Sequence, residues 1–142
     1  ARLLGPEGHL TCIEYNPEHS EVAETLIEYA GLADRVRVIT GASSDVLPDL
    51  WDFGKADFVL LDHKKTLYLP DTITMEKLDI IQRGTVIAAD NIIYPGAPDY
   101  MAHVQQGSQY ETKVRAAAFE YDLKWKEGWE SKADGISFSR RL

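Results

Sequence analysis

The chain is poor in cysteine, in positive charge and in long apolar runs, and each shortage excludes a class of protein. Cys12 is the only cysteine, so no disulfide can form within the chain, and we expect a reducing compartment, the cytoplasm. Lys and Arg number 15 against 23 Asp and Glu, and the formal net charge of −8 would repel the phosphate backbone of a nucleic acid. No apolar run approaches the roughly 18 residues of a transmembrane helix. We therefore expect no nucleic-acid partner and no membrane partner.

The remaining composition is that of an ordinary globular protein, with 44% hydrophobic and 27% charged residues. A chain of 142 residues corresponds to one domain by length. Such a domain buries roughly two-thirds of its surface without needing disulfides. We expect a single domain over residues 1–142.

Apolar runs alternate with helical spacings along the first two-thirds of the chain. Short apolar runs predict strands near residues 9–13, 35–40, 58–62 and 85–89. Helical spacing predicts helices near residues 17–30 and 71–81, a short helix leading to residue 50, and another near 100–105. This order favours a parallel sheet with right-handed crossovers. Residues 110–121 and 135–140 indicate an antiparallel pair at one edge.

Two of the predicted strands end abruptly in polar residues. The apolar run 58–61 is followed by Asp62, and the run 85–89 by Asp90 and Asn91. If the two runs are neighbouring parallel strands, these three side chains converge where ligands bind in open α/β sheets. Carboxylate and amide oxygens are ligands that Mg²⁺ accepts. The pattern predicts a divalent-cation site.

Other candidates are weaker when taken one at a time. Glu14 follows the first strand, where an acid could bind both hydroxyls of a ribose, or it could simply complement the dipole of the next helix. Ser43 and Ser44 could contact a ligand or could cap a helix. Lys65 by itself could be a solvated surface lysine.

Taken together, several short motifs resemble the catechol O-methyltransferase family in order and spacing. They are Gly41-Ala42-Ser43, Leu61-Asp62-His63, Lys65, Tyr68-Leu69-Pro70-Asp71, Ala89-Asp90-Asn91 and Pro95-Gly96. The resemblance implies a Rossmann-like, doubly wound, mostly parallel sheet. It also implies S-adenosylmethionine (SAM) and Mg²⁺ as cofactors, and methyl transfer to one hydroxyl of a catechol or related phenol.

The resemblance also implies a role for particular residues. Metal ligands would be Asp62, Asp90 and Asn91, and the general base would be Lys65. Substrate contacts would come from Lys65, Asn91, Pro95 and Glu120. Cofactor contacts would come from Glu14, Tyr15, Ala42, Ser43, Ser44, Asp62 and His63.

The chemistry of the reaction explains these residue types. Mg²⁺ takes six oxygen ligands, so two carboxylates and an amide leave positions for both catechol oxygens. The metal makes the hydroxyl more acidic and orients it. A nearby dication disfavours the ammonium form of a lysine, so Lys65 could act as a base near neutral pH.

The chain also departs from the pattern of the family it resembles. Lys64 stands where an aromatic residue usually packs on the adenine, and Ser44 replaces a longer amide. The family's first strand, with its acidic and glycine-rich turn, would lie upstream of Ala1. We therefore expect a partial methyltransferase domain, completed by an upstream segment or by another chain. The alternatives are a non-catalytic, methyltransferase-derived subunit of a larger assembly, or a methyltransferase for bulkier phenols.

Overall fold

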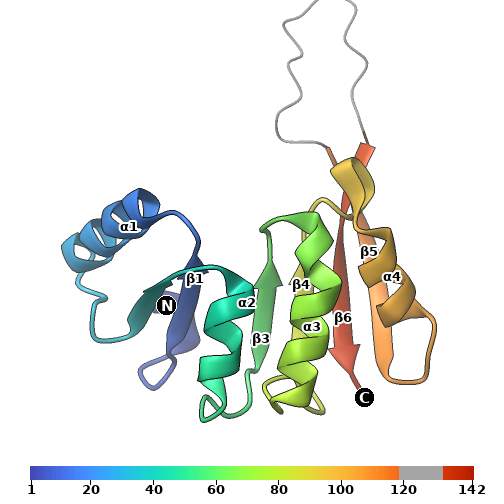
Figure 1. The fold of residues 1–142 in the computed structure, drawn as a ribbon, viewed down its shortest axis with the longest axis horizontal. Coiled ribbons are helices and arrows are strands. Elements are labelled where there is room, and N and C mark those ends of the chain that lie inside the picture. Colours follow the sequence, from blue (N-terminus) through green and yellow to red (C-terminus); the bar gives the residue numbers. More distant parts are fainter. Residues whose placement is uncertain (119–132) are drawn as a thin grey trace, which may run out of the picture. The chain divides into compact units, whose positions relative to one another are not determined.

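The computed structural model describes residues 1–118 and 133–142. It divides into two compact units, residues 1–50 and residues 51–142. Each unit has its own hydrogen-bonded sheet, with strand order β1-β2 in the first unit and β3-β4-β6-β5 in the second. Both units can be followed in Figure 1.

The first unit is a βαβ motif followed by a short helix. Strands β1 (Leu10–Glu14) and β2 (Val36–Thr40) are parallel, with Glu14 opposite Thr40. Helix α1 (Pro17–Tyr29) connects them, and α2 (Ser43–Val46) follows β2 and leads into a 3₁₀ turn. The parallel pair places the carboxyl end of β1 beside the start of the β2–α2 loop, where the Gly41 N–H donates to the Glu14 carbonyl at 2.9 Å.

Both ends of α1 follow from its sequence. The Asn16 side chain caps the amino end by accepting the Glu18 N–H at 2.9 Å. At the other end Gly31 has φ 66°, a left-handed conformation that favours glycine. The Gly31 N–H donates to the Glu28 carbonyl at 2.9 Å, and the Leu32 N–H to the Ile27 carbonyl at 3.0 Å, which together form a Schellman cap.

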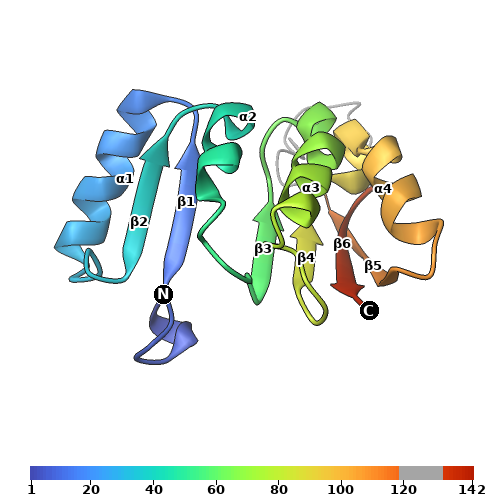
Figure 2. The ribbon, with the colours of Figure 1, turned by 60° about the horizontal axis from the view of Figure 1, so that its bottom comes forward.

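The second unit is a mixed four-stranded sheet. Its elements are β3 (Phe58–Leu61), α3 (Tyr68–Lys77), β4 (Val86–Ala89), α4 (Pro98–Gln105), β5 (Tyr110–Ala118) and β6 (Ala133–Arg141). Strands β3 and β4 are parallel, and β6 lies antiparallel between β4 and β5. Helices α3 and α4 lie on one face of this sheet, as Figure 2 shows. Ile87 and Ala89 of β4 are fully buried.

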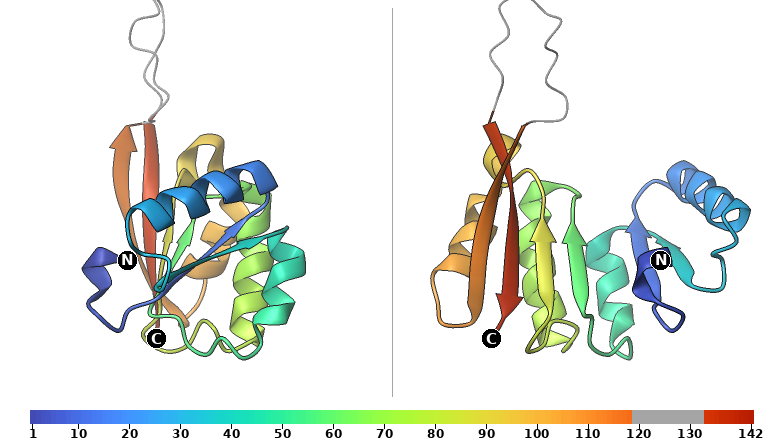
Figure 3. Two further views of the ribbon diagram at one scale, coloured as in Figure 1. Left: turned by 90° about the vertical axis from the view of Figure 1, so that its left-hand side faces the viewer. Right: turned by 180° about the vertical axis from the view of Figure 1, so that it is seen from behind.

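Within the described residues of the second unit, no helix lies on the opposite face of its sheet, as the rear view in Figure 3 shows. Phe58 and Leu60 of β3 are 55% and 63% exposed, and Phe138 of β6 is 39% exposed. The strand register aligns Leu60 with Ala88 and Ala88 with Phe138, so these apolar side chains share one face. An apolar sheet face of this kind is typical of a contact surface.

The expected fold class is confirmed, because parallel strands alternate with helices and an antiparallel pair forms the edge. The predicted helix at 71–81 instead spans Tyr68–Lys77. Pro70 is tolerated at its third position, because the first four N–H groups of a helix have no intrahelical partner. Asp79, at φ 56°, lies beyond its carboxyl end.

In the described residues, every helix is too short or too polar to span a bilayer.

Candidate functional site

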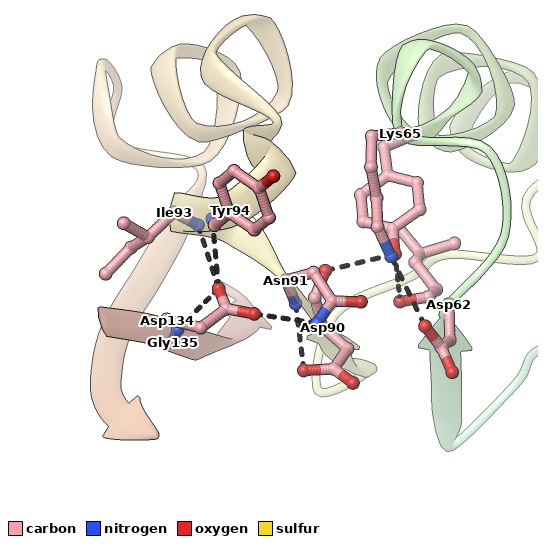
Figure 4. Close-up of polar contacts among 10 residues, drawn as sticks. Asp62, Lys65, Asp90, Asn91, Ile93, Tyr94, Asp134 and Gly135 are labelled. Atoms are coloured by element: carbon pink, nitrogen blue, oxygen red, sulfur yellow. Dashed lines mark hydrogen bonds and ion pairs between the residues drawn. The ribbon is translucent and has the colours of Figure 1, made fainter. Parts of the chain in front are cut away.

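The site is built where β3 and β4 end side by side. Leu61 pairs with Ala89, and the Asp90 N–H donates to the Leu61 carbonyl at 3.0 Å. Asp62 and Asp90 are therefore the first residues beyond two paired parallel strands, and Asn91 follows directly (Figure 4). The expected placement of these three residues beyond the carboxyl ends of adjacent parallel strands is confirmed. Their role as metal ligands stays a prediction.

Lys65 lies at the same edge, anchored by an acid and a phenol. Its Nζ lies 3.3 Å from Asp62 Oδ1 and 2.6 Å from the Tyr68 hydroxyl oxygen. The Lys65 side chain is 13% exposed, whereas that of Asp62 is 55% exposed. These two contacts fix the position of the Lys65 amine beside Asp62.

Tyr68 connects the ends of the two strands. Its hydroxyl donates to the Leu61 carbonyl at 2.7 Å and lies 3.1 Å from the Asp90 carbonyl. Burial first, and then the charges of Asp62 and Asp90, raise the pKa of Tyr68 well above its ordinary value. The phenol therefore keeps its proton and remains a donor to the backbone while it accepts from Lys65.

Asn91 is held by a carboxylate from the neighbouring strand β6. It adopts a left-handed conformation, with φ 54° and ψ 42°, and is 7% exposed. Its Nδ2 donates to Asp134 Oδ2 at 2.7 Å. The other oxygen, Asp134 Oδ1, accepts the backbone N–H groups of Ile93 at 3.2 Å, Tyr94 at 3.1 Å and Gly135 at 2.7 Å (Figure 4).

Asp134 is 2% exposed, yet it is stabilised as a carboxylate. Burial would raise its pKa, but the hydrogen bonds from the Asn91 amide and from three backbone N–H groups outweigh burial and lower the pKa below its ordinary value. A buried charge satisfied in this way is a fixed acceptor in the structure.

His63 is oriented by a buried acid of α3. Its Nε2 lies 2.8 Å from Asp71 Oδ2, and Asp71 is 3% exposed. The ring also lies 5.1 Å from the Tyr68 ring, measured between centroids. The contact of Asp62 and His63 with a cofactor stays a prediction.

The other cofactor candidates lie in the first unit. Glu14 ends β1, and its Oε1 accepts the Asn16 N–H at 2.8 Å and lies 3.8 Å from His19 Nδ1. Tyr15 is 78% exposed. That Glu14 and Ser43 contact the same cofactor as Asp62 stays a prediction, because Glu14 and Ser43 belong to the first unit and Asp62 to the second.

The loop after β2 contradicts the simplest alternative for its serines. Ala42 occupies the N-cap position of α2, so neither Ser43 nor Ser44 is the capping residue. Ser44 is exposed and donates to Asp45 Oδ1 at 3.1 Å. Ser43 Oγ is buried and has no hydrogen-bond partner among the described residues. An orphaned buried hydroxyl fits a missing polar ligand such as the cofactor.

The remaining candidates are less informative. Pro95 is exposed in the turn Ile92–Gly96, and Lys64 is exposed directly before Lys65. Glu120 lies outside the described residues.

The side chains beyond the ends of β3 and β4 are of the kind that bind Mg²⁺. Within residues 1–118 and 133–142, no three His, Cys, Asp or Glu side chains are grouped to hold an ion. The edge offers two carboxylates and the amide of Asn91 instead. Oxygen donors suit Mg²⁺ rather than a thiolate- or imidazole-seeking metal.

Comparison with known proteins identifies the family. Residues 1–142 match the family model described as O-methyltransferase. The chain belongs to the O-methyltransferase family. It is 44% identical over 124 residues to catechol O-methyltransferase of Sus scrofa, covering 85% of this chain and 67% of that protein. It is 43% identical to the enzyme of Bos taurus, again over 85% of this chain but 46% of that protein.

Solved structures support the fold assignment. The O-methyltransferase TomG of Streptomyces achromogenes, solved in complex with SAM, has a TM-score of 0.82 at 20% identity and covers 99% of this chain and 65% of that one. This chain therefore spans between about half and two-thirds of the length of these relatives.

Two side chains of this candidate site were given no role by the sequence analysis. Tyr68 lies three residues after Lys65, a helical spacing that could have revealed the pair. Asp134 lies 43 residues after Asn91, and Asp134-Gly135 resembles an ordinary polar turn, so no local signal marks it.

Proposed function

We propose that the protein transfers the methyl group of SAM to one hydroxyl of a catechol-type substrate with the help of Mg²⁺. Membership of the O-methyltransferase family and 44% identity to a catechol O-methyltransferase support the reaction class. The observation that carries the proposal is the grouping of Asp62, Asp90 and Asn91 at the ends of two paired strands, with Lys65 on Asp62.

Asp62, Asp90 and Asn91 would hold the metal through three oxygens. When bound there, Mg²⁺ would supply Lewis-acid polarisation of the two catechol oxygens. The protein's own contribution would be a rigid edge: the Asp90 N–H donates to the Leu61 carbonyl at 3.0 Å, and Asn91 is locked by Asp134.

Lys65 would take the proton from the reacting hydroxyl. Its Nζ is held between Asp62 Oδ1 and the Tyr68 hydroxyl, next to the place proposed for the metal, and a dication bound there would favour the neutral amine. Because methyl transfer needs the nucleophile in line with the donor, this positioning would supply much of the rate.

The first unit would bind the cofactor, which supplies the methyl group. Glu14 at the end of β1 would accept hydrogen bonds from the ribose hydroxyls. The buried, unpartnered Ser43 Oγ would gain a hydrogen bond from the same ligand.

Methyl transfer from labelled SAM to catechol by the full-length protein, with and without Mg²⁺, tests the proposal. Lys65→Ala is expected to lower kcat by about 100-fold or more, because it removes the general base, while the fold is kept. The control is Lys77→Ala, which removes an exposed lysine of α3 and is expected to leave kcat unchanged.

Mg²⁺-independent turnover, or normal kcat in Lys65→Ala, would contradict the mechanism. Absence of both turnover and SAM binding in the full-length protein would instead support the non-catalytic alternative.

A further inference from the structure

We propose that Asp134 is a positioning residue that fixes the rotation of the Asn91 side chain, so that the amide oxygen faces the metal ligands Asp62 and Asp90. The proposal concerns the metal site of the proposed function and rests on it. Asp134 itself would not touch the metal or the substrate.

The sheet topology puts Asn91 between two different neighbours. Strand β4 pairs with β3 on one side and with β6 on the other. Asp62 follows β3, and Asp134 belongs to β6, so the two acids approach Asn91 from opposite sides, as Figure 4 shows. The side-chain nitrogen of Asn91 is turned to the β6 side, 2.7 Å from Asp134 Oδ2.

An asparagine ligand needs such a partner more than an aspartate ligand does. Its oxygen and nitrogen have nearly the same shape, and a half-turn about the last bond exchanges an acceptor for a donor. Only the oxygen can bind Mg²⁺. An ionised carboxylate accepts hydrogen bonds and cannot donate them. The favoured rotamer of Asn91 is therefore the one that places its NH₂ group, and not its oxygen, next to Asp134.

Asp134 can impose this choice because it is itself fixed. Its Oδ1 accepts three backbone N–H groups, from Ile93, Tyr94 and Gly135, at 2.7 to 3.2 Å. The residue is 2% exposed, so water does not compete at Oδ2. Partners of this kind behind a ligand commonly tune metal affinity by 10- to 100-fold.

The key variants are Asp134→Asn and the double variant Asn91→Asp with Asp134→Asn. In the single variant the new amide can keep its oxygen on the three backbone N–H groups, which turns its NH₂ toward Asn91 and forces the Asn91 amide to rotate. In the double variant the polarity of the pair is reversed. The amide at position 134 then donates to a carboxylate at position 91, whose other oxygen can still bind metal.

Binding of Mg²⁺ alone is measured by isothermal titration calorimetry, and binding of Mn²⁺ alone by electron paramagnetic resonance, on the full-length protein. Asp134→Asn is expected to weaken binding by roughly 10- to 100-fold. The double variant is expected to recover most of the loss. Asp52→Asn, which removes the same charge from an exposed position, is the matched control and should bind normally.

A second measurement needs no metal. The side-chain NH₂ signals of Asn91 in a ¹H–¹⁵N spectrum should exchange slowly with water in the unaltered protein and in Asp52→Asn, and faster in Asp134→Asn. Thermal unfolding of each variant checks that it is folded.

The outcomes separate this inference from the proposed function. Normal metal affinity in Asp134→Asn, or a double variant as weak as the single one, would overturn the role of Asp134 and leave the metal site standing. If the unaltered protein bound neither Mg²⁺ nor Mn²⁺, the proposed metal site would be wrong, and the role of Asp134 would fall with it.

Discussion

At the scale of single residues, Tyr68 links Lys65 to the ends of two strands. Its hydroxyl accepts from Lys65 and donates to the Leu61 carbonyl at the end of β3, and the same oxygen lies 3.1 Å from the Asp90 carbonyl beyond β4. The side chain is fully buried, so water cannot replace these contacts. Removing the hydroxyl would leave buried polar groups without their partner.

Tyr68→Phe is therefore expected to lower the free energy of unfolding by about 1–3 kcal/mol. Urea denaturation monitored by circular dichroism measures the change. Tyr29→Phe is the control, because Tyr29 is 93% exposed and its substitution should change stability by less than about 0.5 kcal/mol. Equal stability of Tyr68→Phe and the unaltered protein would show that the hydroxyl is not needed.

Asp134 predicts a pH dependence of stability. Hydrogen bonds hold the pKa of Asp134 below its ordinary value in the folded state. The ionised side chain therefore contributes fully to the stability of the fold above the unfolded pKa of about 3.9, and this contribution is lost as pH falls through the folded pKa. Asp134→Asn cannot titrate, so it should be less stable than the unaltered protein by about 1–3 kcal/mol at pH 7.

That stability difference should stay constant from pH 7 to about pH 5 and shrink below about pH 3.9. Unfolding in urea at pH 7, 5 and 3 measures it. A difference that grew on acidification would show that the sign of the pKa shift is wrong.

At the scale of elements, helix caps and strand ends determine the positions of the candidate residues. Helix α1 ends in a Schellman cap, which returns the chain to β2 and so sets Thr40 opposite Glu14. The cap requires Gly31 at φ 66°, where an alanine would be strained.

Gly31→Ala is expected to lower the free energy of unfolding by about 1 kcal/mol. Gly107→Ala is the matched control, because Gly107 has no positive φ and its added Cβ would meet nothing closer than 3.9 Å. The two variants are compared by thermal unfolding. If Gly107→Ala were the more damaging of the two, the cap would not be the weak point.

The elements and the metal-ligand candidates could be placed from the sequence because they depend on local periodicity. An apolar run that stops at Asp62, and another that stops at Asp90, predict two strand ends. Asp134 could not be placed, because its contact with Asn91 depends on the antiparallel register of β6 against β4, which no local pattern encodes. Helix α3 begins at Tyr68, three residues before the predicted residue 71, because proline is tolerated in the first turn of a helix, where Pro70 lies.

At the scale of the whole molecule, the proposed tasks are divided between the two units. The candidate residues for the metal and the base, Asp62, Lys65, Asp90 and Asn91, all belong to the second unit. The ribose candidate Glu14 and the orphaned Ser43 belong to the first. The central claim, a metal site at the edge of β3 and β4, can therefore be tested on the second unit's own residues.

The most direct measurement is anomalous diffraction from crystals of the protein grown with Mn²⁺, which occupies the same oxygen sites as Mg²⁺. The account predicts one strong peak about 2.2 Å from oxygens of Asp62, Asp90 and Asn91. Its absence from the Asp90→Asn variant would support the assignment. A peak elsewhere, or no peak between these three residues at saturating Mn²⁺, would contradict the claim.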